Sequence, residues 1–190
     1  NTMGYRLSKL YTRTGDKGDT GLANGERIAK NHPRVAAMGD VDELNCQVGL
    51  LITELTDYRV HPLLALLTPI QHRLFDLGGE LAVPGHDMID AADVAQLEQA
   101  IDELNADLEP LTNFILPGGS KAIAQAHMAR SVCRRAERQY ISLAQQDEVN
   151  QQALIYLNRL SDLLFVLART IARLEETPEV LWAPKPKPAA

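Results

Sequence analysis

The segment from Tyr11 to Gly21 has the composition of a phosphate-binding loop. It reads Tyr-Thr-Arg-Thr-Gly-Asp-Lys-Gly-Asp-Thr-Gly. Glycines let backbone N–H groups turn toward one point, threonine hydroxyls add donors, and Arg13 and Lys17 add positive charge. The segment has neither a Walker A string nor the strand–helix context of a Rossmann fingerprint. This composition favours a polyphosphate ligand, and a flexible glycine-rich arm is the alternative.

A stripe of arginines follows later in the chain. Arg130, Arg134 and Arg138 recur every four residues, a spacing that stacks three like charges on one face of a helix. An anion lying against the stripe would relieve the repulsion, and guanidinium groups offer paired donors that match phosphate oxygens. Small residues along the same predicted helix would let a ligand or a neighbouring backbone come close. The alternative is a solvated face paired to acids on other helices.

Two other predicted helices carry polar residues beside their apolar seams. Asp42 and Asn45 lie one turn apart on the first helix, and Asn158 and Asp162 lie one turn apart on the last. Residues in such places are ordinarily hydrogen-bond partners between helices. Asp42 is also a candidate partner for one arginine of the stripe.

Several other kinds of site have no counterpart in the sequence. No Gly-x-Ser-x-Gly nucleophile elbow occurs. His72 and His127 lack the glutamate three residues earlier that di-iron sites in bundles use. Cys46 and Cys133 lack metal-type spacing and indicate structural thiols in a reducing compartment. We expect no metal site built from side chains.

Composition narrows the class of protein. A chain of 190 residues, 45% hydrophobic and 23% charged, suits one folded domain. The net charge of −6 argues against a protein that coats nucleic acid. Apolar runs are too short to span a membrane, and no secretory signal is visible. We therefore expect a cytoplasmic protein without nucleic-acid or membrane partners.

Apolar periodicity predicts the elements that must position these residues. Alternating three- and four-residue steps occur in five stretches, the pattern of helices packed side by side. The stretches start near Arg34, Pro62, Asp90, Ser120 and Ala153. They predict an all-α five-helix bundle with an extended Gly-rich N-terminal loop. Pro69 should kink the second helix or restart it.

The same pattern divides the chain into parts. We assign residues 1–176 to a single bundle domain and residues 1–32 within it to a phosphate-binding arm. Residues 177–190 contain four prolines, and we expect an extended and mobile tail there.

Five motifs occur in a fixed order along the chain. They are Tyr-Thr-Arg-Thr-Gly-Asp-Lys-Gly at 11–18, Gly-Asp-Val-Asp-Glu-Leu-Asn at 39–45, Phe-Ile-Leu-Pro-Gly-Gly-Ser at 114–120, Ala-Arg-Ser-Val-Cys-Arg-Arg-Ala-Glu-Arg at 129–138 and Leu-Asn-Arg-Leu-Ser-Asp at 157–162. Together they resemble the PduO-type ATP:cob(I)alamin adenosyltransferases. That family transfers the 5′-deoxyadenosyl group of ATP to the cobalt of cob(I)alamin and releases triphosphate, using Mg²⁺. The resemblance implies a homotrimer with active sites between subunits, and Mg²⁺ carried by the triphosphate.

The resemblance also implies roles for individual residues. Those expected around the triphosphate are Thr12, Arg13, Thr14, Gly15, Lys17, Gly18, Thr20 and Gly21. Those expected to complete the ATP site are Lys30, Arg134, Arg135, Glu137, Arg138 and Asn158. Asp42 would pair with Arg130 across the subunit boundary. Phe114 would stand over the corrin and help to keep the lower base off the cobalt. Arg134, Arg130, Asp42 and Phe114 are the catalytic candidates.

Elementary chemistry is consistent with these roles. Cob(I)alamin is itself a strong nucleophile, so the protein need not supply one. The leaving triphosphate is highly charged, and fixed cations and backbone donors would stabilise it. Excluding water and the axial base with Phe114 would make cobalt(II) easier to reduce to cobalt(I). Two residues depart from expectation, because Pro69 interrupts a helix and Asp19 adds negative charge to the phosphate loop.

The residues alone leave two other functions open. A non-catalytic ATP-binding trimer could sense nucleotide or carry cobalamin to a partner, and it would need the same ATP site. It would not need Phe114, Arg134 or the pair of Asp42 and Arg130, so their presence favours the enzyme. A purely structural bundle would leave the arginine stripe unexplained. Further partners of the enzyme would be a cobalamin-dependent acceptor enzyme or a cobalt reductase.

Overall fold

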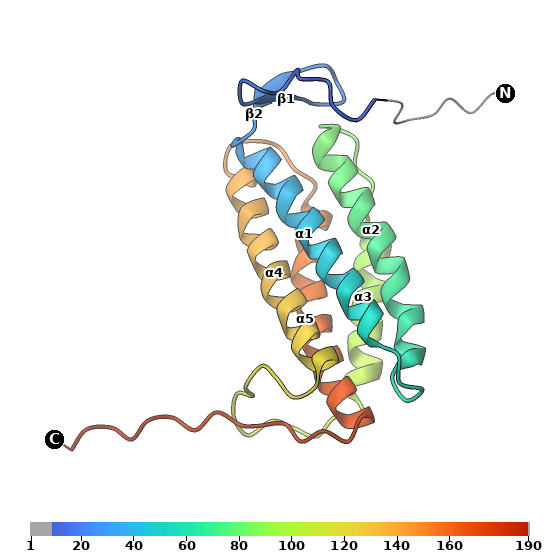
Figure 1. The fold of residues 1–190 in the computed structure, drawn as a ribbon, viewed down its shortest axis with the longest axis vertical. Coiled ribbons are helices and arrows are strands. Elements are labelled where there is room, and N and C mark those ends of the chain that lie inside the picture. Colours follow the sequence, from blue (N-terminus) through green and yellow to red (C-terminus); the bar gives the residue numbers. More distant parts are fainter. Residues whose placement is uncertain (1–8, 190) are drawn as a thin grey trace.

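The computed structural model describes residues 9–189. In this part of the chain the elements are β1 (Asp19–Gly21), β2 (Arg27–Ala29), α1 (Pro33–Glu54), the 3-10 turn η1 (His61–Leu63), α2 (Leu64–Ala82), α3 (Ala91–Asn105), α4 (Lys121–Ala144) and α5 (Gln151–Leu174). The five α-helices run side by side along one axis (Figure 1). The predicted all-α five-helix bundle is confirmed.

The helix starts follow from local hydrogen bonds that the sequence encodes. The Ser120 hydroxyl accepts from the Ile123 amide at 3.2 Å and caps α4. Asp90 and Asp93 form a reciprocal capping box at the start of α3. Each cap satisfies amide groups that have no partner within the helix. These caps fix where α3 and α4 begin, and so fix the loop between them.

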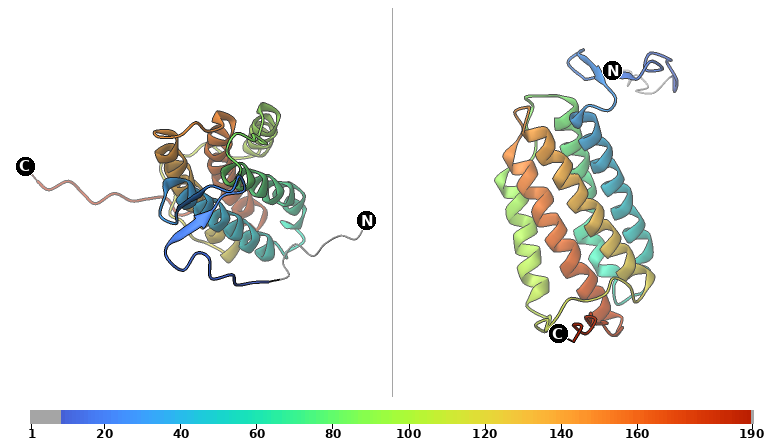
Figure 2. Two further views of the ribbon diagram at one scale, coloured as in Figure 1. Left: turned by 90° about the horizontal axis from the view of Figure 1, so that it is seen from above. Right: turned by 90° about the vertical axis from the view of Figure 1, so that its left-hand side faces the viewer.

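The core is aliphatic and is centred on α4, which packs between α1 and α5, while α2 packs on α1 and α3 on α5 (Figure 2). Small residues form the inner face of α4, and Ala126, Ala129, Cys133 and Ala136 are fully buried. They let the neighbouring helices approach closely. The small-residue seam therefore serves helix packing, and the ligand-facing alternative is not needed to explain it.

Pro69 does not divide α2, so the predicted restart is wrong, while the predicted kink stays a prediction. The helix runs from Leu64 to Ala82 with Pro69 inside it. Pro69 lies in the second turn and is exposed, so the one backbone acceptor that it leaves free is near water and close to the helix start. The loss of one hydrogen bond at such a position is tolerated more easily than in the buried middle of a helix.

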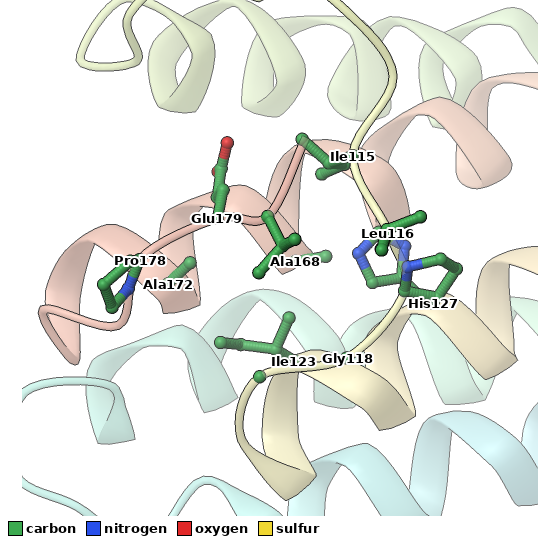
Figure 3. Close-up of a pocket in the computed structure, with 12 residues that line it drawn as sticks. Ile115, Leu116, Gly118, Ile123, His127, Ala168, Ala172, Pro178 and Glu179 are labelled. Atoms are coloured by element: carbon green, nitrogen blue, oxygen red, sulfur yellow. The ribbon is translucent and has the colours of Figure 1, made fainter. Parts of the chain in front are cut away.

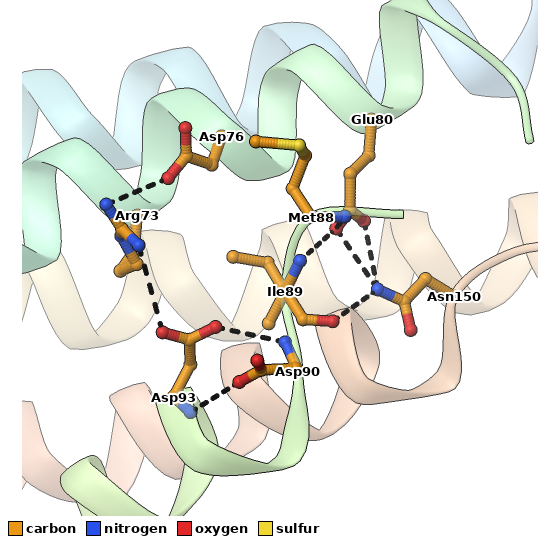
Figure 4. A network of polar contacts seen from close by, with 8 residues as sticks. All are labelled: Arg73, Asp76, Glu80, Met88, Ile89, Asp90, Asp93 and Asn150. Carbon is orange, nitrogen blue, oxygen red and sulfur yellow. Dashed lines mark hydrogen bonds and ion pairs between the residues drawn. The ribbon is translucent and has the colours of Figure 1, made fainter. Parts of the chain in front are cut away.

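A buried carboxylate organises one end of the bundle. Glu80 of α2 accepts hydrogen bonds from the amides of Met88 and Ile89 and from Asn150 Nδ2, the last at 3.1 Å (Figure 4). Burial raises the pKa of Glu80, and these hydrogen bonds oppose the rise. The side chain thereby ties the loop before α3 to the start of α5.

The N-terminal arm lies beyond this same end of the bundle (Figures 1 and 2). β1 and β2 pair antiparallel, with Thr20 opposite Ile28. The Ala23 amide donates to the Ala82 carbonyl at 3.0 Å, which attaches the hairpin to the end of α2. Arg34 is buried below it and donates to the Leu81 carbonyl at 3.2 Å. Residues 19–29 of the arm thus form a hairpin attached to the end of α2, and residues 9–18 form the loop that precedes it.

The opposite end holds the loop between α3 and α4 and the segment after α5. This segment folds back, and Leu181 forms an antiparallel bridge with Ile115. The mobility expected of residues 177–190 stays a prediction, while backbone pairing places residues 180–182 against the loop. Proline content does not reveal this contact between distant chain segments.

Candidate active site

The N-terminal arm encloses a cavity of about 320 Å³. Six of the eight residues predicted around the triphosphate line it, together with Lys30 of the predicted ATP site; the six are Thr12, Arg13, Thr14, Gly15, Thr20 and Gly21. Lys17 and Gly18 do not line this cavity. The arm therefore gathers hydroxyls, small residues, three cations and the acid Asp16 around one space.

Backbone geometry explains why glycines occur in this loop. Gly18 has a φ of 94°, which L side chains rarely adopt, and its amide donates to the Gly15 carbonyl at 3.1 Å. At Gly15 a Cβ atom would lie 3.0 Å from both the Asp19 carbonyl oxygen and Lys30 Nζ. Gly15 thus allows the Lys30 ammonium to lie directly against the loop.

Arg27 neutralises Asp19, the acid that departs from expectation in the phosphate loop. It donates from Nη2 to Asp19 Oδ1 at 3.1 Å and to the Thr14 carbonyl at 2.8 Å. The hydrogen bond from Arg27 is the main reason why the pKa of Asp19 lies below its ordinary value. Arg13, Lys17 and Lys30 form no ion pair within residues 9–189. Their charges therefore stay available for an anion.

The arginine stripe on α4 also lacks acidic partners in the described part of the chain. Arg134 and Arg138 are exposed and form no ion pair there, and Arg130 only donates to His127 Nδ1, at 3.4 Å. Burial, and then the charge of Arg134, lowers the pKa of Arg130. The three guanidinium groups thus remain mutually repulsive, as the anion-binding interpretation predicts and the solvated, acid-paired one does not.

Two polar residues extend this surface from α4 to α5. Asn158 Nδ2 donates to Glu137 Oε1 at 3.1 Å, and Arg159 Nη1 donates to Asn158 Oδ1 at 2.6 Å. Both Glu137 and Asn158 are partly exposed. The predicted ATP residues of α4 and α5 therefore lie together along one helix pair.

Arg135 belongs to a different surface. Its Nη1 donates to Asp40 Oδ1 at 2.7 Å, and its Nη2 donates to the Glu43 carboxylate. These acids hold the pKa of Arg135 above its ordinary value, chiefly through the hydrogen bond to Glu43. Both terminal nitrogens of Arg135 bind acids of α1, so they are less available for ATP than those of Arg134 and Arg138. The predicted place of Arg135 in the ATP site stays a prediction. The Asp40 and Glu43 partners were missed because spacing on one helix does not show which neighbour packs beside it.

Asp42 lies on α1 at a groove of about 510 Å³ between α1 and α2. It is exposed and has no ion-pair partner among the described residues. Asn45, one turn later, donates to the Gln71 carbonyl at 3.2 Å and so joins α1 to α2. Asn45 thus has the interhelical role expected of such residues, while Asp42 is left for another partner.

Phe114 lies in the loop between α3 and α4, and this loop is at the end of the bundle opposite to the arm (Figure 2). Its side chain is 75% exposed, and its ring lies 6.2 Å from that of Trp182. The 24 residues of α4, or about 36 Å, run between the two ends. One chain therefore does not bring its own phosphate loop and Phe114 to one small site.

Comparison with known families shows to which family this chain belongs. The family model described as cobalamin adenosyltransferase matches residues 10–171. This chain belongs to the cobalamin adenosyltransferase family. The resemblance seen in the five sequence motifs is confirmed.

Relatives in the family cover nearly the whole chain. A cobalamin adenosyltransferase from Cupriavidus metallidurans is 54% identical over 183 residues, covering 95% of this chain and 97% of its own. A corrinoid adenosyltransferase from Bacillus subtilis is 45% identical over 167 residues, covering 86% of each chain.

Solved structures give the same fold. A variant of the PduO-type adenosyltransferase from Lactobacillus reuteri complexed with ATP superposes with a TM-score of 0.87 at 40% identity, covering 92% of this chain and 100% of its own. Another variant, complexed with cobalamin and ATP, gives a TM-score of 0.85 at 39% identity, covering 92% and 99%. The bundle is therefore the fold of the family.

Proposed function

We propose that this chain is an ATP:cob(I)alamin adenosyltransferase, with residues 1–32 as the arm that binds the triphosphate. It transfers the 5′-deoxyadenosyl group of ATP to the cobalt of cob(I)alamin. The observation that carries the proposal is the unpaired stripe of Arg130, Arg134 and Arg138 in a chain of this family. The relatives named for this activity and the complexes with cobalamin and ATP support the substrates.

For this reaction the protein must position the two substrates and stabilise the negative charge of the leaving triphosphate. The cobalt(I) electron pair forms a bond to C5′ of ATP, the bond from C5′ to oxygen breaks, and its electron pair leaves with the triphosphate. Arg134 and Arg138, with the cations and hydroxyls of the arm, would stabilise that charge as it develops. No group of three or more His, Cys, Asp or Glu side chains able to hold a metal occurs within residues 9–189. Mg²⁺ would therefore enter on the triphosphate, beside the hard oxygen donors of Thr12 and Thr14.

The active site would be shared between copies in a homotrimer. The arm and Phe114 lie at opposite ends of one bundle, so a ligand that touches both needs a second chain. Asp42 and Arg130 each lack an oppositely charged partner among residues 9–189, which suits an ion pair between subunits. Phe114 would face the corrin and keep water and the lower base from the cobalt.

We also place the reaction in the cytoplasm. Cys46 and Cys133 are both free thiols, as a reducing compartment requires. None of the helices in the described part of the chain is long and apolar enough to cross a membrane. A cobalamin-dependent acceptor enzyme or a cobalt reductase would be its further protein partner.

The test is an anaerobic assay with chemically reduced cobalamin, ATP and Mg²⁺. We expect loss of the cob(I)alamin absorbance together with one triphosphate for each adenosylcobalamin formed. Arg134→Met should abolish most of this turnover, and Arg73→Met, on an exposed part of α2, is the matched control. Tight ATP binding without transfer would instead indicate a nucleotide sensor or cobalamin carrier.

Sedimentation tests the assembly separately. A trimer at micromolar concentration, weakened by Asp42→Ala, is the expected result. A monomer that still turns over would contradict a shared site.

A further inference from the structure

The end of α5 sends the chain back toward the loop that carries Phe114. Glu176 has a φ of 55°, and the Thr177 amide donates to the Ala172 carbonyl at 2.9 Å. The Glu176 amide donates to the Arg173 carbonyl at 3.2 Å. This is the Schellman pattern of helix ends, which reverses the chain direction. Residues 178–182 therefore run along the end of the bundle (Figure 1). We call them the return segment.

The return segment pairs with the backbone of Phe114. The Trp182 amide donates to the Phe114 carbonyl at 2.7 Å, and the Leu116 amide donates to the Val180 carbonyl at 2.8 Å. Asn113 Nδ2 adds a bond to the Trp182 carbonyl at 2.9 Å. Because the Phe114 ring is mostly exposed, this pairing and the Trp182 ring are what define its place.

Little packing lies beneath the return segment. Pro178, Glu179 and Val180 cover one side of a cavity of about 250 Å³, whose other walls include Ile115, Ile123, His127 and Ala168 (Figure 3). The segment borders a cavity on this side, so directional polar contacts with the bundle matter for its place.

Such contacts are made by Arg169 of α5, which is only 8% exposed. Its Nε donates to Glu179 Oε1 at 3.2 Å, and its Nη2 donates to the Glu109 carbonyl at 2.8 Å. A single buried guanidinium thus joins the helix, the return segment and the start of the loop before α4. Charge-assisted bonds of this kind are stronger and more directional than neutral ones.

We propose that Arg169 is a positioning residue for the use of cob(II)alamin, because its ion pair with Glu179 holds the return segment, and through it Phe114, where the lower base must be kept off the cobalt before reduction. The inference rests on the proposed function. It adds to that function an ion pair beside the loop that carries Phe114, at the end of the bundle opposite to the arm. Arg169 touches neither ATP nor corrin in this scheme. It acts only through the backbone pairing of Trp182 with Phe114.

The first measurement is the fluorescence of Trp182, which is the only tryptophan of the chain. Arg169→Met keeps the length of the side chain and removes its donors. Glu179 is partly exposed and can turn to water, so the bundle should stay folded. We expect the anisotropy of Trp182 to fall and its quenching by acrylamide to rise toward that of the urea-unfolded chain. Arg173→Met, one turn later on α5 with a weak exposed partner, is the matched control and should change neither.

The second measurement compares turnover from cob(II)alamin with turnover from cob(I)alamin. With cob(II)alamin and a reductant, where the lower base must be kept off, we expect kcat of Arg169→Met to fall by about 10- to 100-fold. With chemically prepared cob(I)alamin, kcat and the KM for ATP should stay close to those of the unaltered chain. Glu179→Gln keeps an acceptor without the charge and should give an intermediate loss, which also covers the case that Arg169→Met does not fold.

The outcomes are distinguishable. If the unaltered chain transfers nothing, the proposed function fails, while Trp182 fluorescence still reports whether Arg169 holds the segment. If Arg169→Met behaves like Arg173→Met in fluorescence, the idea that the Arg169–Glu179 ion pair holds the return segment is refuted. If fluorescence changes but turnover from cob(II)alamin does not, the ion pair is only structural and the positioning role is refuted.

Discussion

Replacing Arg134 by methionine should weaken catalysis and strengthen the fold at the same time. Arg134 is exposed and pairs with no acid in the described part of the chain, so its removal leaves no unpaired partner. It lies between Arg130 and Arg138 at helical spacing, where each like-charge pair destabilises a helix by about 0.2–0.5 kcal/mol. The lowered pKa of Arg130 records part of that repulsion. Without ATP, the free energy of unfolding should therefore rise by about 0.4–1 kcal/mol.

The catalytic effect has the opposite sign and is larger. A guanidinium aimed at the charge of the leaving triphosphate contributes about 3 kcal/mol, or roughly a hundredfold in kcat. The two measurements are kcat with cob(I)alamin and urea unfolding without ATP. Arg135→Met is the contrasting variant, because it breaks the ion pairs with Asp40 and Glu43 and should lower the free energy of unfolding by about 1 kcal/mol. Equal destabilisation by the two variants would refute the assignment of Arg134 to an anion.

Three further predictions address other parts of the molecule. Gly15→Ala should raise the KM for ATP by about tenfold without loss of helix, because its Cβ would meet the Asp19 backbone and Lys30 at 3.0 Å; an unchanged KM in steady-state assays would show that the loop does not close on phosphate. Burial lowers the pKa of His127 to about 4, so the unfolded chain binds a proton there at a higher pH than the folded one. Stability present above pH 6.5 should then be lost as the pH falls toward 4, by up to about 3 kcal/mol, and His127→Gln should remove that part of the dependence in urea titrations. Glu176→Gly should raise the free energy of unfolding by about 0.5–1 kcal/mol, because a left-handed helix end favours glycine and the contact of Glu176 with Arg59 at 3.9 Å is exposed. A decrease in thermal melts would show that this ion pair outweighs the gain.

The helices could be predicted because their signals are local. Apolar periodicity and caps such as Asp90 and Ser120 act within a few residues, and the structure confirms them. That the loop residues gather around one cavity could be predicted for the same reason, since its glycines and threonines lie within eleven residues of sequence. The restart at Pro69 was predicted wrongly because the cost of a proline depends on how deep it lies in the helix and on its exposure, neither of which the residue type gives.

Contacts between distant segments could not be predicted in this way. Arg135 directly follows Arg134 on α4, yet packing directs it to Asp40 and Glu43, about ninety residues away. Arg27 carries no motif, but the hairpin register brings it onto Asp19. In each case the partner of a charge, and not its type, determines whether the charge is free to bind a ligand.

The same distinction explains why one chain carries two incomplete halves of a site. At one end, the cations of the arm and the upper part of the arginine stripe can bind a polyphosphate; at the other, Phe114 and Trp182 form an exposed aromatic pair. Exposed aromatic groups and unpaired arginines are costly features for an isolated chain. In the proposed trimer, both would become favourable, because a second copy would bring its arm to the stripe and complete the proposed pair of Asp42 and Arg130. Assembly would then be the step that turns two binding surfaces into one catalytic site, which is why sedimentation and turnover should fail together in variants of Asp42.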